Sequence, residues 1–309
     1  MKMFSYIVQR IFWGIVTLWV VVTVTFMLMH GIPGGPFDGD SLQQMNETVR
    51  ANLEAKFGLD RPYIEQYGLY LSNLFKGELG ISITYSPRTV KQIIARGFPV
   101  SAKLGLVSIV ISVFIGVVLG IWAALKRSKW QDTLVKVFTT IGITIPGFVL
   151  ATMLIYVFAV KLRLLPSYGF RSIKHVILPA IALSLGSIAF IARLTRSSML
   201  DVIRQDYIRT ARAKGLSPTT VIYKHALKNA LMPIVTYLGP LVASLLTGSF
   251  IVEKIFSIPG MGGEMVSAIG NRDYMMILGL TTFFSIILIV TYILVDIIYV
   301  LIDPRLKFD

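Results

Sequence analysis

The segment Arg193–Pro233 combines eight basic and two acidic side chains, a density that suits contact with acidic partners or with anionic lipid. Within it, Ile203, Tyr207 and Ala211 recur every four residues, which predicts one face of a helix. Gly215 can adopt the left-handed backbone conformation that ends a helix. The segment therefore predicts a short helix that stops at a tight turn.

A second short helix is predicted directly after that turn. Ser217 can cap it with its hydroxyl group, and Pro218 suits the first helical position, where a missing N–H costs nothing. Residues 201–230 are therefore expected to form two short helices on the cytoplasmic side. A DNA-reading helix-turn-helix is disfavoured because membrane spans hold both ends. Positive-inside topology and lipid binding explain the charge but leave the turn unexplained.

Catalytic and metal chemistry find little support elsewhere in the sequence. The chain has no cysteine, and His30, His175 and His225 fall in separate segments without metal-ligand spacing, so each is interpreted as an interface residue. No phosphate-binding loop occurs, so ATP must be hydrolysed by another subunit. The apolar stretches hold no nucleophile with its base and no paired carboxylates. We expect a non-catalytic chain that binds no cofactor and no metal.

Hydropathy defines the elements that must position the basic segment. Of the 309 residues, 55% are hydrophobic and 15% are charged, and the mean hydropathy is +0.72. A membrane-spanning helix needs about 20 mostly apolar residues. Six uncharged stretches meet or approach that length, which predicts an all-α, polytopic membrane protein with six spans. They are residues 11–29, 104–125, 137–160, 176–192, 231–252 and 274–295.

The distribution of basic residues predicts the topology. With both termini in the cytoplasm, the short inner segments carry 16 Lys and Arg residues and the short outer loops carry 6. The long segment 31–98 largely escapes this rule. The first apolar stretch is too long for a signal peptide and lacks a small-x-small cleavage site, so residues 1–30 are expected to remain as the first helix.

Residues 31–98 are expected to form a small domain outside the membrane after the first span. Asp40 or Ser41 can cap a first helix and Gly58 can end it. A second helix is predicted from Pro62. The apolar residues of the first helix recur at helical spacing, namely Leu42, Met45, Val49, Leu53 and Phe57.

The end of this insertion predicts a helix lying on the membrane surface. Val90, Ile93, Ile94 and Phe98 would form its apolar face, and Pro99 would start the second span.

Proline and glycine interrupt several spans, at Pro146–Gly147, Pro179, Pro233 and Gly239–Pro240. Such interruptions free backbone carbonyls, which suits a wet passage. Simple bending for helix packing is an equally good interpretation. The hydroxyl groups in these spans fit both interpretations: Thr139, Thr140, Thr144, Ser184, Ser187, Thr236, Ser244 and Thr247.

The segments Tyr207–Ser217 and Lys224–Leu231 resemble the coupling-loop motif of ABC importer permeases, most closely in the oligopeptide and dipeptide branch. The general pattern is Glu-Ala-Ala, three residues, Gly, and after nine residues Ile-x-Leu-Pro. Aligning Gly215 with the motif glycine places the matching positions at Arg209, Thr210 and Ala211 before it, and at His225, Leu227 and Lys228 after it. The departures from the general motif are those of the peptide branch.

A second pair of segments, Glu253–Gly262 and Asn271–Tyr274, is similar to the same branch, as is the ending Asp303–Pro304–Arg305. A sharp external turn would explain the glycines without any ligand. The resemblance also allows a gate or a receptor contact, for which the candidate residues are Pro259, Gly260, Gly262, Arg272 and Asp273.

The resemblance implies the fold of a type I ABC importer permease, with a transmembrane domain over residues 97–302. Its spans would cover residues 99–125, 137–160, 176–195, 231–252 and 274–300. The chain would be a multi-pass protein of a bacterial cell membrane and would form half of a pathway for oligopeptides or dipeptides. Implied partners are a second related permease, two ABC ATPase subunits that hold ATP and Mg, an external peptide-binding lipoprotein and membrane lipid, but no nucleic acid.

The resemblance also implies which residues contact the ATPase. Tyr207, Ala211, Leu216 and Leu227 would supply apolar anchors, and basic groups would meet acidic ones. The full set of candidate coupling residues is Tyr207, Thr210, Ala211, Arg212, Lys214, Gly215, Leu216, Ser217, His225, Leu227 and Asn229.

Two alternatives stay open. Relatives in the same branch carry nickel chelates, haem or other small solutes, and neutral side chains do not choose among these cargoes. An ion-coupled carrier is the other alternative, but it usually needs ionisable groups at membrane depth. The first five apolar stretches contain none, and Asp296 lies near the inner end of the sixth.

Overall fold

The computed structural model describes residues 2–37 and 46–302, and these residues form helices joined by short loops. Within them the only strand-like pairing is a single bridge between Ile81 and Thr89, so the all-α prediction is confirmed. The first half of the chain contains α1 (Lys2–Gly31), α2 (Glu47–Phe57), α3 (Tyr63–Phe75), α4 (Val90–Leu125), α5 (Trp130–Thr144), α6 (Gly147–Leu154) and the π-helix η1 (Ile155–Lys161). The second half contains α7 (Ile173–Ile203), α8 (Asp206–Ala213), α9 (Pro218–Thr220), the π-helix η2 (Val221–Ala226), α10 (Leu227–Ala230), α11 (Met232–Leu246), α12 (Phe250–Ile255), α13 (Met261–Gly270) and α14 (Tyr274–Ile302).

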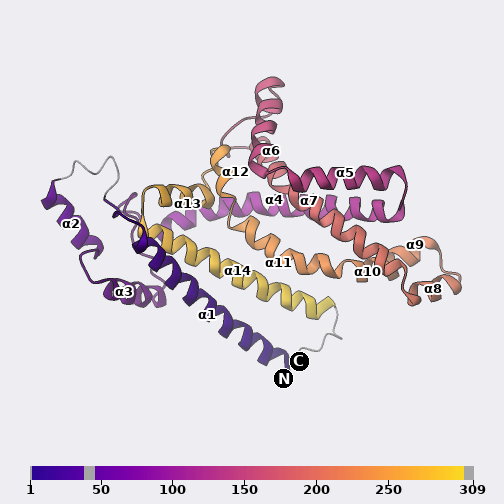
Figure 1. Cartoon of the computed structure of the whole chain (residues 1–309), viewed down its shortest axis with the longest axis horizontal. Coiled ribbons are helices and arrows are strands. Elements are labelled where there is room, and N and C mark those ends of the chain that lie inside the picture. Colours follow the sequence, from indigo (N-terminus) through magenta and orange to yellow (C-terminus); the bar gives the residue numbers. More distant parts are fainter. Residues whose placement is uncertain (1, 38–45, 303–309) are drawn as a thin grey trace.

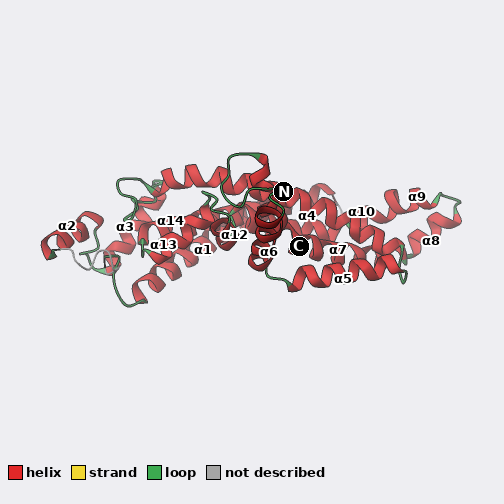
Figure 2. Ribbon diagram, turned by 90° about the horizontal axis from the view of Figure 1, so that it is seen from above, coloured by secondary structure: helices red, strands yellow, loops and turns green. Residues whose placement is uncertain are grey.

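Five helical segments of the described chain are long and apolar enough to cross a membrane, and a bent pair makes a sixth. The five lie in α1, α4, α7, α11 with α12, and α14. Figure 1 shows that α2 and α3 lie at one end of the molecule and that α8 and α9 lie at the other. Figure 2 shows the same elongated arrangement from above. The insertion and the basic segment are therefore separated by the length of the spans.

The third span departs from the sequence prediction. Residues 137–160 were expected to form one kinked helix, but α5 ends at Thr144 and the following helix leaves at an angle of 101°. Pro146 has no N–H for helical hydrogen bonding and disfavours helical geometry at Ile145, which is extended with φ −76° and ψ 119°. In Figure 1, α6 stands away from the layer formed by α4, α5 and α7.

The start of the second span also differs. Pro99 does not start a helix, because α4 begins at Val90 and runs through it. Thr89 forms a capping box with Gln92, which fixes the helix start before the proline. Val90, Ile93 and Ile94 do not form an exposed apolar face. They are buried in a cluster with residues of α13 and α14.

The helices of the insertion agree in part with the predictions. Gly58 ends α2 in a left-handed conformation, and α3 begins directly after Pro62, as predicted. The cap of α2 is Asn46, whose side chain accepts a hydrogen bond from the Thr48 N–H. The predicted caps Asp40 and Ser41, and the apolar positions Leu42 and Met45, lie outside the described residues, as do Asp303, Pro304 and Arg305.

Side-chain contacts hold α3 and α1 against α14. The hydroxyl groups of Tyr70 and Thr282 lie 3.0 Å apart. Burial raises the pKa of the Tyr70 hydroxyl, so the phenol remains protonated and keeps this hydrogen bond. At the opposite end of α14, Arg10 forms an ion pair with Asp296 at 3.0 Å.

The most extensive helix contact joins α4 to α7, and glycine makes it possible. A Cβ atom added at Gly116 would lie 2.8 Å from the Ile191 side chain, and one added at Gly120 would lie 2.6 Å from the Ala192 carbonyl oxygen. These two glycines are four residues apart, the spacing of small residues that lets membrane helices approach closely. The pair α4 and α7 forms the centre of the bundle.

We predict that Gly120→Val lowers the thermal stability of the purified protein, because its side chain has no space between α4 and α7. Overpacking of this kind costs about 1–3 kcal/mol. Gly68→Val is the control, since no atom lies within 4 Å of an added Cβ there. Thermal unfolding of both variants is measured in detergent, as the loss of the monodisperse size-exclusion peak on heating. Equal stability of the two variants would show that the helices do not pack this closely.

Candidate functional site

The basic segment forms an elbow, the name used here for residues 201–230. Helix α7 runs to Ile203, and α8 follows after a short turn. Gly215 has φ +76°, a left-handed conformation, and ends α8 as the sequence predicts. Ser217 then accepts a hydrogen bond from the Thr220 N–H at 3.3 Å, and Pro218 occupies the first helical position. Residues in and next to the turn therefore determine where the first helix ends and where the second begins.

The elbow has an apolar core of its own that rests on the ends of α4 and α7. Ile208 and Ala211 from α8 are buried with Val221, Ala226 and Ala230, and the cluster continues into Ala124 of α4 and Met199 of α7. Two of the expected anchors therefore face inward. Ala211 is 7% exposed and Leu227 is half-buried against the same core. They hold the elbow together.

The outward face of the elbow carries most of the other candidate coupling residues. Tyr207 and Leu216 are exposed, and the Tyr207 hydroxyl accepts a hydrogen bond from the Asn229 side chain at 2.7 Å. This bond joins α8 to α10. Thr210, Arg212, Lys214, Gly215 and Ser217 are also exposed, whereas His225 is half-buried. Exposed Tyr223, at 59%, lies in the same elbow but was not predicted, because no sequence signal separates it from the basic residues around it.

A buried ion cluster ties α5 to α7 close to the elbow. Asp132 is fully buried, and both of its oxygens accept hydrogen bonds from Arg196, at 2.6 and 2.9 Å. Lys136 lies 3.0 Å from the same carboxylate, and the Ser128 N–H donates to it. The sequence analysis missed this cluster. Asp132 and Arg196 are of opposite charge, but 64 residues separate them, so the sequence alone did not indicate that they pair.

Three of the predicted gate residues, Pro259, Gly260 and Gly262, lie in a joint formed by residues 248–263, which includes α12 and the start of α13. Glu253 is fully buried there. Its carboxylate accepts hydrogen bonds from the Ser101 hydroxyl and from the Gly262 N–H, both at 2.8 Å. Ser101 in turn accepts from the Met261 N–H at 2.8 Å. The joint thereby connects α12 and α13 to α4.

The joint requires glycine because other parts of the chain approach these positions closely. The sequence analysis had expected a sharp turn instead. Neither Gly260 nor Gly262 has a positive φ. A Cβ atom added at Gly262 would lie 2.8 Å from the Ser249 backbone, and one at Gly260 would collide with Glu253. Pro259 is exposed at the surface of the joint. The sequence analysis included Glu253 in the motif without recognising it as the centre of these contacts.

Asp273 connects the insertion to the start of α14. Its carboxylate accepts hydrogen bonds from the Ser82 hydroxyl at 2.5 Å, from the Thr84 N–H at 3.0 Å and from the Met276 N–H at 3.1 Å. The last bond caps α14. Neighbouring Arg272 has φ +52° and is half-buried. Asp273 is buried and fully engaged, so it supports the fold of this end of the molecule.

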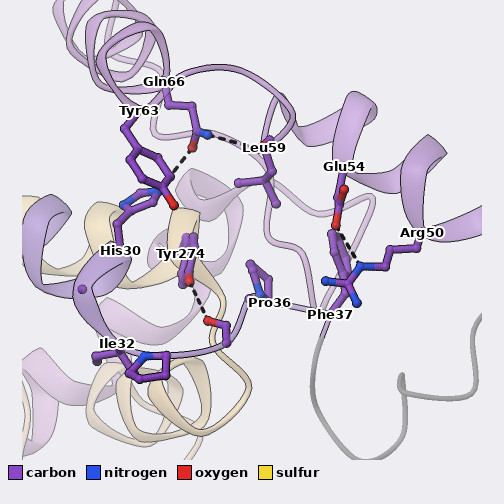
Figure 3. Close-up of a pocket in the computed structure, with 14 residues that line it drawn as sticks. His30, Ile32, Pro36, Phe37, Arg50, Glu54, Leu59, Tyr63, Gln66 and Tyr274 are labelled. Atoms are coloured by element: carbon purple, nitrogen blue, oxygen red, sulfur yellow. Dashed lines mark hydrogen bonds and ion pairs between the residues drawn. The ribbon is translucent and has the colours of Figure 1, made fainter. Parts of the chain in front are cut away.

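A pocket of about 410 Å³ lies between the insertion and the ends of α1 and α14 (Figure 3). His30 contributes to it from α1 and lies 3.3 Å from Gln66, while Tyr274 donates a hydrogen bond to the Gly34 carbonyl. Arg50 pairs with Glu54 at its rim. His30 therefore lies at a helix interface, as predicted. No group of three or more potential metal ligands occurs among the described residues.

Known protein families account for nearly the whole chain. Residues 116–308 match the family described as binding-protein-dependent transport system inner membrane component, and residues 3–105 match the N-terminal membrane component of such systems. The chain belongs to this family of multi-pass inner membrane transport proteins.

Relatives of the same length share the similarity throughout. The dipeptide transport system permease protein DppB of Bacillus subtilis is 51% identical over 306 residues, covering 99% of this chain and 98% of that protein. The oligopeptide transport system permease protein OppB of Salmonella typhimurium is 42% identical over 308 residues, covering 99% and 100%.

Solved structures support the fold. A chain of the inward-facing MetNI methionine ABC transporter matches with a TM-score of 0.58 and 21% identity, over 69% of this chain and 97% of that one. The polytopic, all-α fold of an importer permease is therefore shared.

We predict that Arg196→Met lowers the unfolding free energy by about 3 kcal/mol, because it leaves the buried Asp132 carboxylate without its main partner. Lys136→Met is the matched control. The Lys136 side chain is 53% exposed, so its loss should cost under about 1 kcal/mol. Thermal unfolding of the two variants in the same detergent measures the difference, and equal losses would contradict a dominant role for Arg196.

Proposed function

We propose that this chain is the permease subunit of an ATP-driven importer of dipeptides or oligopeptides and forms half of its membrane pathway. The observation that carries this proposal is the 51% identity to a dipeptide permease over 99% of the chain. Similarity of that extent includes the insertion, the spans and the elbow. Substrate choice within such a family can differ between members, so uptake of labelled peptides is the direct test of cargo.

The elbow supplies the coupling mechanism of the proposal. Its outward face offers Tyr207, Leu216 and the basic groups of Arg212 and Lys214 to a partner, while its buried core transmits contact to α4 and α7. An ATPase subunit with an acidic, partly apolar groove would fit this face. Closure of two such ATPase subunits, which hold the ATP and Mg, would then rock the spans.

The proposed membrane topology follows from the positions of the elbow and the insertion at opposite ends of the molecule. The elbow faces the cytoplasm, and α2, α3 and the joint face the outside, where an external peptide-binding protein would dock. The described beginning of α1 and end of α14 lie away from α2 and α3 (Figure 1), which supports the proposal that both termini are cytoplasmic. A second, homologous permease would complete the pathway.

The energy source and the cargo can be tested in sealed, right-side-out membrane vesicles that contain the complete transporter and can be loaded with ATP. We expect uptake of labelled di- and tripeptides to stop without ATP and to continue in the presence of an uncoupler. Competition with unlabelled peptides, a nickel chelate and haem identifies the cargo. Uptake that collapses with the uncoupler would indicate an ion-coupled carrier, and competition by nickel chelate or haem alone would reject peptide import.

We predict that Gly215→Val reduces peptide uptake by about tenfold or more, because a β-branched residue at φ +76° costs about 1–3 kcal/mol and distorts the turn. Gly215→Asn is the control, since asparagine tolerates the left-handed conformation. Neither variant meets a neighbouring atom within 4 Å of its Cβ. Membrane insertion and uptake are measured together. Normal uptake by an inserted Gly215→Val variant would reject the coupling role of the turn.

A further inference from the structure

A cavity of about 440 Å³ lies at the break between α5 and α6. The end of α5 and the start of α6 form one side of it, and α7, α11 and α12 form the others. Ile143, Pro146 and Gly147 line it from the break, and Ser187 lines it from α7. Its volume falls within the range of about 300–1,000 Å³ that is typical of small-molecule sites.

The position of the cavity along α7 places it near the middle of the membrane. Lys174 and Arg193 are the charged residues that bound the apolar part of this helix, and the 19 helical steps from one to the other span about 28 Å. That length matches a hydrocarbon core of about 30 Å. Gly142 lies against Leu185, since an added Cβ would be 3.4 Å from the Leu185 carbonyl oxygen. Leu185 is about 16 Å from Lys174 along the helix.

A helix break at this depth cannot face lipid. The last carbonyls of α5 and the first amides of α6 have no partner within their own helices, and lipid offers them no hydrogen bond. Pro146 and Gly147 are nevertheless exposed on the surface of this chain. Non-helical backbone at membrane depth is tolerated where it contacts protein or lines a water-filled cavity. The break must therefore border the transport pathway or the sister permease.

The chemistry of the lining favours a neutral, hydrogen-bonding occupant. Ser187, Ser249 and Tyr237 bring hydroxyl groups to the cavity, and Ser187 forms a hydrogen bond with Tyr237. None of the described residues that line it is charged. A nickel chelate or a haem carboxylate would need ligands or counter-charges that are missing from this lining. Hydroxyl groups and free backbone amides instead match the amide groups that all peptides share.

We propose that this cavity is a transit site for the peptide main chain, through which the permease accepts peptides of differing side-chain charge. The proposal rests on the proposed function and extends it by assigning where and by which chemistry the cargo is handled within this chain. A neutral site binds no particular side chain tightly. It therefore suits passage of a mixed set of peptides, each recognised upstream by the external binding protein.

The natural absence of cysteine allows a direct test with single cysteine variants. Ile143→Cys places the thiol in the cavity, whereas Ile141→Cys places it on the same helix outside the lining. Both native side chains are similarly exposed, at 45% and 51%. The complete transporter is reconstituted in vesicles with its binding protein and a non-hydrolysable ATP analogue, and modification of this chain by a water-soluble maleimide is followed by mass spectrometry.

We expect Ile143→Cys to react readily and to be protected about fivefold by saturating tri-alanine, which corresponds to roughly four fifths occupancy. Tri-lysine and tri-glutamate should protect to the same extent if the main chain is recognised. Ile141→Cys should react slowly and show no protection. An unreactive Ile143→Cys, equal reaction at both positions, or reaction without peptide protection would each overturn the proposal. Protection by only one charge type would overturn main-chain recognition.

A second pair of variants tests passage itself. Ile143→Trp fills the cavity from a side chain that is already exposed, and we expect it to reduce peptide uptake by about tenfold. Ile141→Trp is the matched control and should retain at least about half of the uptake. Assembly with the partner subunits is measured for both. Normal uptake by an assembled Ile143→Trp variant would overturn the transit site alone, whereas a wild-type complex that imports no peptide would overturn the proposed function.

Discussion

Close contact between α4 and α7 organises the rest of the molecule, and it exists because small residues line both helices. Gly116 and Gly120 leave room for the α7 backbone. Further along the same contact, Ser184 donates a hydrogen bond to the Ser108 carbonyl at 3.2 Å, and Ser112 donates to the Ser184 carbonyl at 3.4 Å. Lipid tails are as apolar as leucine, so packing and such hydrogen bonds must hold membrane helices together. The two helices therefore form one closely packed unit.

This unit links the two ends of the chain. Helix α4 begins beside the insertion, where Ser101 joins it to the joint through Glu253. Helix α7 continues directly into the elbow, whose core includes Ala124 of α4 and Met199 of α7. Arg196 adds α5 through Asp132. A displacement of the elbow would consequently move α4, α5 and α7 together, which is the property that a lever between an ATPase and a pathway requires.

Features determined by neighbouring residues were predictable from the sequence, and features determined by distant contacts were not. The turn of the elbow follows from Gly215, Ser217 and Pro218, which act within a few residues of one another. Hydropathy similarly located the spans. The 101° break at Pro146 was predicted only as an interruption, because the angle depends on how α6 packs against α7 and α12. The partners of Glu253 lie up to 152 residues away, beyond any local pattern.

The placement of charge bears on how the protein is driven. Carboxylates near the spans have partners within the chain: Asp132 has Arg196, Asp296 has Arg10, and Glu253 has Ser101 with the Gly262 N–H. An ion-coupled carrier needs an ionisable group that exchanges its partner for the coupling ion as the pathway opens. The cavity at the α5–α6 break has no charged lining residue among those described. The cavity proposed as a transit site therefore offers, among its described lining residues, no ionisable group of the kind that an ion-coupled carrier uses. The elbow, at the far end of the α4–α7 unit, carries exposed aromatic and basic groups, which fit the proposed contact with an ATPase subunit.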